Sequence, residues 1–185
     1  MIGRLLRLGF LAGLAAWLTD RWLAGRAAAE RRPHPRPVET LIVIDAPIEA
    51  VWEVLADVPG QPRWMAEMKA VRLLTPGPVG VGTQGEATVR ILGLPITDPV
   101  TITRFNPPTR FSLRHEGTFA GEGDIVLEPG ADGTTTIVRW SEALAPPVLP
   151  WLWNEAARPV LGDIFQRDLE RLRELVEAGL ERSPA

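Results

Sequence analysis

Short segments between residues 38 and 144 alternate apolar and polar side chains and end at glycine or proline. This period of two predicts β-strands with one buried and one solvent-facing side. In residues 84–92, Ala87, Val89 and Ile91 alternate with polar residues. The expected strands are 38–46, 71–75, 84–92, 100–105, 110–116, 118–128 and 134–142.

Residues 150–180 change to spacings of three and four, which predicts one long helix with a single buried stripe. The polar residues, among them Asp163, Arg167 and Asp168, are expected on the solvent side. Pro159 lacks a backbone donor and predicts a kink or a break. The stripe consists of Ala157, Leu161, Ile164, Phe165, Leu169, Leu172, Leu175 and Val176.

The order of the elements predicts an α+β domain over residues 38–180, with residues 181–185 as a tail. Two short helices, one starting at Pro47 and one near residues 62–68, interrupt the strands, and residues 93–99 read as a turn. Strands joined by short turns form an antiparallel meander, and the long helix covers one face of it. We expect about six or seven strands curved around the C-terminal helix.

Residues 1–25 form a further apolar segment with arginines at both ends. Three interpretations compete. A membrane-anchor helix would place Trp17 and Trp22 at an interface. A cleavable signal peptide would use the small residues 27–29, and a soluble helix would pack on the domain. We favour the anchor because charges at Asp20 and Arg21 occupy the region that a signal peptide keeps neutral.

Residues 26–37 read as an arginine- and proline-rich linker that favours an extended spacer, in which His34 is a solvated loop residue. Residues 1–37 contain seven arginines and two acidic residues, and the remainder has 13 basic and 21 acidic residues. The net charges are therefore +5 and −8. The arginines after the apolar segment predict membrane association with the main domain on the cytoplasmic side.

The acidic main domain argues against nucleic acid as a partner, since nucleic-acid binding requires a basic surface. The chain has no cysteine and two histidines far apart. This excludes disulfides and thiolate sites and disfavours a histidine metal cluster. We expect neither a metal nor another cofactor.

Several segments, taken in order, resemble the START-like (SRPBCC) superfamily, which includes polyketide cyclase/dehydrase-type and lipid-transport proteins. They are IDAPIEAVWEVLADVPGQPRWM, VGVGTQGEATV, VTITRFNPPTRFSL and DIVLEPGADGTTTIVRW, followed by the closing helix. The resemblance covers about residues 38–178. It implies a helix-grip fold, a curved antiparallel sheet around a long C-terminal helix, with an apolar ligand between sheet and helix.

Binding of a hydrophobic molecule is the function we expect first, with a lipid, quinone or polyketide-like ligand and a role as a membrane-tethered carrier or sequestering protein. The structural alternative for each lining residue is plain core packing. The candidate ligand-binding residues are Trp52, Leu55, Trp64, Met65, Val89, Ile91, Phe111, Leu113, His115, Trp140, Leu161, Ile164 and Phe165.

An enzyme of the cyclase/dehydrase type is the alternative. His115 shares strand parity with Phe111 and Leu113, so it should face the cavity, where a histidine can act as an acid or base. Arg139 is a second catalytic candidate. No set of nucleophile, base and orienting acid can be assembled from the sequence. Convergence of His115, Arg139 and a carboxylate would favour catalysis, and an apolar lining would favour carriage.

The N-terminal end of the long helix is the expected ligand portal. Trp151 and Trp153 lie in the apolar sequence PPVLPWLW, which could touch a membrane or cover a pocket entrance.

Overall fold

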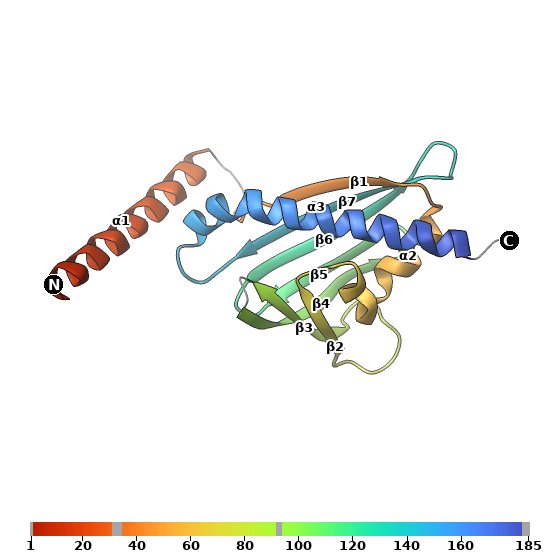
Figure 1. Cartoon of the computed structure of the whole chain (residues 1–185), viewed down its shortest axis with the longest axis horizontal. Helices are drawn as coiled ribbons and strands as arrows, with labels where there is room; N and C mark the ends of the chain where they lie inside the picture. The colour runs from red at the N-terminus through yellow and green to blue at the C-terminus, as the bar shows by residue number, and fades with distance from the viewer. Residues whose placement is uncertain (1, 31–34, 92–93, 183–185) are drawn as a thin grey trace.

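The computed structural model describes residues 2–30, 35–91 and 94–182, although the side chains of residues 2, 3, 91 and 94 are outside the description. Seven antiparallel strands form one sheet in the order β1-β7-β6-β5-β4-β3-β2. The sheet curves around the long helix α3, which confirms the predicted helix-grip fold (Figure 1). The strands are β1 (Val38–Ile44), β2 (Met68–Leu73), β3 (Gln84–Ile91), β4 (Leu94–Asn106), β5 (Arg110–Glu116), β6 (Ala120–Pro129) and β7 (Thr136–Ala145).

Strand β4 is longer than the sequence predicted, because residues 94–99 pair with β3 and do not form a turn. Pro95 and Pro99 occupy this part of the strand. Pairing of β4 with β5 starts at Val100, so these prolines lie where β4 has a neighbour on one side. A proline without an N–H is tolerated at such an edge, and the extension places Asp98 on the sheet.

Two short helices close one end of the sheet. The helix α2 (Ile48–Ala56) buries Val51, Trp52 and Leu55. The 3₁₀ helix η1 spans Val58–Arg63, so the second helix predicted at 62–68 lies earlier in the chain. The side chain of Asp57 accepts a hydrogen bond from the backbone N–H of Gly60 and starts this turn.

The helix α3 (Pro150–Arg182) is one continuous helix with Pro159 inside it, so of the kink or break predicted at Pro159, the break is wrong. Its fully buried residues are Leu169 and Leu172, on the predicted stripe. Asp168 was expected to face solvent but is buried. Its Oδ1 atom accepts hydrogen bonds from the backbone N–H of Ala66, at 3.0 Å, and from Arg171, at 2.8 Å. Asp168 therefore fastens the segment before β2 to the helix.

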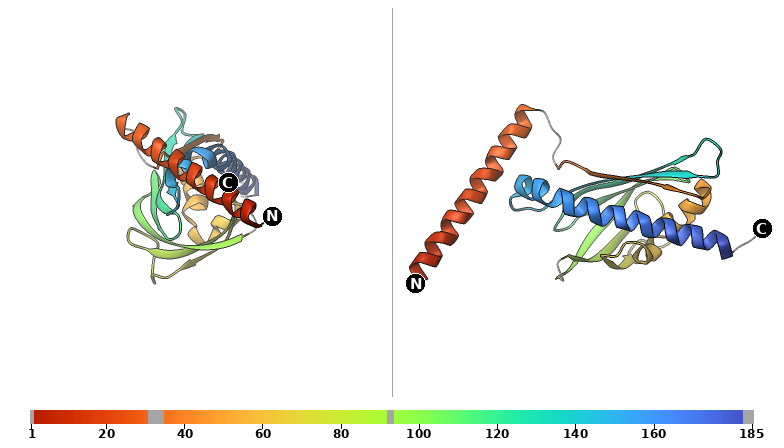
Figure 2. Two further views of the ribbon diagram at one scale, coloured as in Figure 1. Left: turned by 90° about the vertical axis from the view of Figure 1, so that its left-hand side faces the viewer. Right: turned by 45° about the horizontal axis from the view of Figure 1, so that its top comes forward.

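The helix α1 (Ile2–Ala29) extends away from the sheet, and its second half meets the N-terminal end of α3 (Figure 2). Among the described residues, no helix is long and apolar enough to cross a membrane. The expectation that residues 1–25 form a transmembrane helix is therefore not supported. His34 lies outside the described residues.

Candidate functional site: a buried histidine beside an apolar cavity

A small cavity of about 40 Å³ lies between the concave face of strands β3–β5 and the edge formed by η1 and β2. Its polar groups come from Gln61, Thr83 and His115. The other lining residues are Val58, Met68, Val71, Leu73, Gly85, Ala87, Val100, Ile102, Phe111 and Leu113. The cavity is thus mainly apolar, and its volume is close to that of one water molecule in the liquid, about 30 Å³.

The predicted ligand-binding residues divide into two groups. Phe111, Leu113 and His115 line the cavity, on the side of β5 that their parity predicted. The other described candidates are not among the lining residues. Trp52, Leu55, Trp64 and Trp140 belong to the buried core, and Met65 and Phe165 pack against that core. Val89, Leu161 and Ile164 are half-buried, and the side chain of Ile91 lies outside the description.

This cavity lies elsewhere than the ligand cavity expected from the sequence. The sequence placed it between the sheet and α3, whereas the residues that surround it come from η1, β2 and the strands. The helix side is filled by aromatic packing. The ring of Phe165 stacks on that of Trp140 with centroids 4.5 Å apart, and Trp64 meets Trp140 edge-on at 6.0 Å.

His115 lies between two buried carboxylates. Its Nδ1 atom is 3.0 Å from Oδ2 of Asp98, and its Nε2 atom is 2.9 Å from Oε1 of Glu142. The second contact is an ion pair whose angle does not meet hydrogen-bond geometry. The other oxygen of Glu142 accepts a hydrogen bond from the indole N–H of Trp140, at 2.8 Å. The group therefore connects β4, β5 and β7 through side chains.

Glycines make room for this arrangement. Strand β6 lies between His115 on β5 and Glu142 on β7, and Gly123 is the residue paired with Glu142. A Cβ atom at Gly123 would be 2.5 Å from Oε2 of Glu142. The absence of a side chain at this position lets the carboxylate cross β6 toward the imidazole. Gly117 similarly leaves space for the Asp98 carboxylate.

The two carboxylates control the protonation of His115. Burial disfavours the charged imidazolium, but the hydrogen bond to Asp98 and the close negative charges of Asp98 and Glu142 outweigh burial and raise the pKa of His115 to about 9. At neutral pH the ring is therefore protonated. Both N–H groups face carboxylates, so neither nitrogen is available to a molecule in the cavity.

Arg139 does not join this group. It lies on the outer face of β7, where its side chain is 54% exposed and 3.6 Å from Glu128. The sequence-based expectation that Arg139 is a polar group of the cavity is therefore wrong. In the part of the chain that the structure describes, no group of three or more histidine, cysteine or acidic residues could hold a metal ion.

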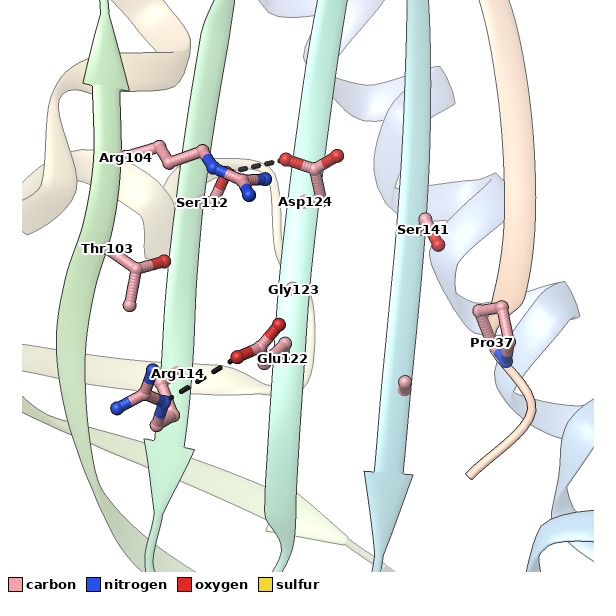
Figure 3. Close-up of a pocket in the computed structure, with 10 residues that line it drawn as sticks. Pro37, Thr103, Arg104, Ser112, Arg114, Glu122, Gly123, Asp124 and Ser141 are labelled. Carbon is pink, nitrogen blue, oxygen red and sulfur yellow. Dashed lines mark hydrogen bonds and ion pairs between the residues drawn. The ribbon is translucent and has the colours of Figure 1, made fainter. Parts of the chain in front are cut away.

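A second hollow, of about 420 Å³, lies on the opposite face of the sheet. Figure 3 shows its polar lining, with Ser112 beside Asp124 and Arg114 beside Glu122. Arg110 also donates two hydrogen bonds to Asp124, both at 2.9 Å, outside the lining. Burial opposes ionisation of Asp124, but Arg110 and Ser112 hold its pKa below the usual value. These charges are satisfied by one another, and the hollow is separate from the apolar cavity.

The N-terminal end of α3, the expected portal, contacts both the β5–β6 connection and α1. Trp153 lies beside Phe119 of the β5–β6 connection, with ring centroids 5.5 Å apart. Oδ1 of Asp20 accepts hydrogen bonds from the backbone N–H groups of Trp151 and Leu152, at 2.8 and 2.9 Å. A residue of α1 thus supplies the N-terminal cap of α3.

Sequence reasoning did not identify Asp98, Glu142 and Gly123 as parts of one site. Asp98 fell in a predicted turn. The parity of Glu142 with Trp140 on β7 was readable, but strand order was needed to bring it near His115. The glycines at 121 and 123 were a usable signal, because glycine inside a strand marks a close approach of other groups.

Comparison with known proteins gives a family match and a set of structural neighbours. The family described as "Polyketide cyclase / dehydrase and lipid transport" matches residues 36–177. No curated protein matches the chain.

Solved structures with the same fold have low sequence identity. A START superfamily protein from Mycobacterium smegmatis is 17% identical, with a TM-score of 0.63 over 77% of this chain and 98% of that one. A protein from Thermus thermophilus is 20% identical, with a TM-score of 0.63 over 78% of this chain and 99% of that one. The di-domain ARO/CYC BexL is 22% identical, with a TM-score of 0.62 over 80% of this chain and 48% of that one.

Proposed function

Because this chain belongs to the polyketide cyclase/dehydrase and lipid transport family, we propose that it binds a hydrophobic small molecule beneath η1 and β2. The ligand classes that fit an apolar lining are lipids, quinones and polyketide-like molecules. In this proposal the protein is a carrier or sequestering protein that α1 holds at a membrane, with the main domain on the cytoplasmic side.

The contacts of His115 favour a carrier protein over an enzyme. A general acid or base must reach the proton that it transfers, at hydrogen-bond distance. Both nitrogens of His115 are instead directed at Asp98 and Glu142, at 3.0 and 2.9 Å. The remaining polar lining residues, Gln61 and Thr83, are uncharged. The lining therefore supports binding through apolar contact.

Ligand entry requires the edge of the sheet to open. The cavity of about 40 Å³ is far below the roughly 300–1,000 Å³ of a typical ligand site. β2 is the edge strand, paired with β3 alone and irregular between Met68 and Ala70. Movement of η1 and β2 away from β3–β5 would enlarge the cavity without breaking the centre of the sheet.

An enzyme of the cyclase/dehydrase type is the second candidate. The observation that favours it is the convergence of an imidazole and two carboxylates next to the cavity. A ligand that displaced one carboxylate from His115 would meet a proton donor, because the ring is protonated at neutral pH. Under this alternative, a bound substrate would lose water during incubation.

Native mass spectrometry of the full-length protein tests the proposal. The protein is purified without detergent and then incubated with a fatty acid, a quinone or a polyketide that still carries a β-hydroxy ketone. We expect a species heavier than the chain by one intact hydrophobic molecule. A ligand released with the mass of one water lost would favour the enzyme. Detection of the bare chain under all conditions would contradict both functions.

A further inference from the structure

Residues 5–22 of α1 form an exposed apolar surface on a basic helix. Its large apolar side chains are between 42% and 71% exposed. Most large apolar side chains of a folded domain are buried, and a contiguous exposed group marks an interaction site. The exposed residues are Leu5, Leu6, Leu8, Phe10, Leu11, Leu14, Trp17, Leu18 and Trp22.

Apart from Asp20, the charged residues of α1 between positions 2 and 29 are arginines. Arg4, Arg7 and Arg21 are exposed and form no ion pair within the described residues. Arg26 lies over the ring of Trp22, 5.0 Å from its centroid. The one acidic residue between positions 2 and 29 is Asp20, which is 8% exposed because it turns inward to cap α3. The exposed charged side chains between positions 2 and 29 are therefore all arginines, of which Arg26 also pairs with Glu30 just after the helix, at 3.3 Å.

We infer that α1 binds the surface of an anionic lipid bilayer, with its apolar residues in one leaflet and its arginines at the phosphate groups. This inference rests on the membrane attachment proposed above and adds the lipid class and the depth. Anionic headgroups attract clusters of arginine near the surface, and tryptophan favours the interface. The acidic domain, with a net charge of −8 over residues 38–185, is repelled by the same surface, which leaves α1 as the contact.

The spacing of the charges determines the depth. The uncharged residues Leu8–Thr19 number twelve. At 1.5 Å per residue, this segment is about 18 Å long, against a hydrocarbon thickness of about 30 Å. A helix that keeps both Arg7 and Arg21 at headgroups therefore enters one leaflet. The Asp20 cap then places the first turn of α3 at the same surface.

Vesicle flotation of the full-length protein tests the inference. Vesicles of phosphatidylcholine are compared with vesicles that also contain phosphatidylglycerol. We expect stronger binding to the anionic vesicles, reduced by added salt. Each arginine near an anionic surface contributes about a fivefold change in partitioning, so the triple variant R4Q/R7Q/R21Q should bind about a hundredfold more weakly.

The matched control removes three arginines from the far half of α3, Arg167, Arg173 and Arg182, which form no ion pair in the described residues. This variant should bind more tightly than the α1 variant.

Equal binding of the wild type to neutral and anionic vesicles would overturn the lipid class. No binding to either would overturn the membrane attachment itself. Self-association through α1 without vesicle binding would assign the surface to a second copy of the chain. Fatty-acid binding without vesicles, measured on the same variants, reports the ligand site separately.

Discussion

The Nδ1 atom of His115 lies 3.0 Å from the buried carboxylate of Asp98. This contact joins the end of β5 to the N-terminal part of β4, and Glu142 of β7 contacts the other ring nitrogen of His115. Two buried carboxylates with one imidazolium between them depend on that cation. Their position beside the apolar cavity makes the group the polar boundary of the proposed ligand site.

Replacement of His115 by asparagine should destabilise the domain, because it leaves the two carboxylates buried without a positive partner. Removal of one partner from a buried ion pair costs about 3–5 kcal/mol. Urea unfolding at pH 7 gives the free energy of unfolding. If the substitution lowered the free energy of unfolding by less than about 1 kcal/mol, water would already screen the two carboxylates.

Stability should fall as pH rises from about 6.5 to 9. The pKa of His115 is raised from 6.5 to about 9 in the fold, so the folded chain holds a proton that the unfolded chain releases. Protonated His115 contributes roughly 3 kcal/mol to the free energy of unfolding. This contribution is complete below pH 6.5 and is lost as pH rises through 9. Urea unfolding across this range should show the decrease in the wild type but not in His115→Asn. Equal slopes for both proteins would contradict the assignment.

Replacement of Gly123 by alanine should separate Glu142 from His115, because the new Cβ atom would meet Oε2 of Glu142 at 2.5 Å. The expected result is a lower pKa of His115, measured by NMR titration of the imidazole. Gly162→Ala is the matched control, since its Cβ would meet only Val38 at 3.7 Å. In α3, alanine should add about 0.5–1 kcal/mol of stability. An unchanged His115 titration in Gly123→Ala would show that Glu142 does not control the ring.

Asp20→Ala should loosen the first turn of α3, because the N–H groups of Trp151 and Leu152 lose their acceptor. Loss of such a cap costs about 1 kcal/mol, which corresponds to several-fold faster amide exchange at these two residues. Asp20→Asn keeps an oxygen acceptor and should retain most of the protection. If both variants exchanged like the wild type, the link between α1 and α3 would have no energetic role.

The sequence was sufficient for the fold because its signals are local. Alternation along β5 placed Phe111, Leu113 and His115 on the concave face, and the stripe of α3 identified Leu169 and Leu172 as core. The failures came from residues whose surroundings are distant in the chain. Pro95 and Pro99 suggested a turn, but β3 provides a pairing partner for them. Asp168 looked exposed, although the N–H of Ala66 draws it into the interior.

The site was less predictable than the fold. The distance between His115 and Glu142 depends on which strands are neighbours and on the missing side chain of Gly123. Arg139 is a different kind of failure, because its strand parity, opposite to that of Trp140, already directed it outward toward Glu128. To predict side-chain contacts between strands, one must therefore know the order of the strands in the sheet. The local pattern of apolar and polar residues does not give that order.

Binding of a fluorescent fatty acid to cavity-filled variants is the most direct test of the central claim, that a hydrophobic molecule binds beneath η1 and β2. Ala87 lines the cavity, and Thr88 is the adjacent residue of β3 on the opposite face. The larger side chain in Ala87→Leu should cost about 1–3 kcal/mol of stability and weaken binding at least about tenfold, which is 1.4 kcal/mol. Thr88→Leu should bind like the wild type. Equal affinities of Ala87→Leu and the wild type, with both proteins folded, would contradict the account.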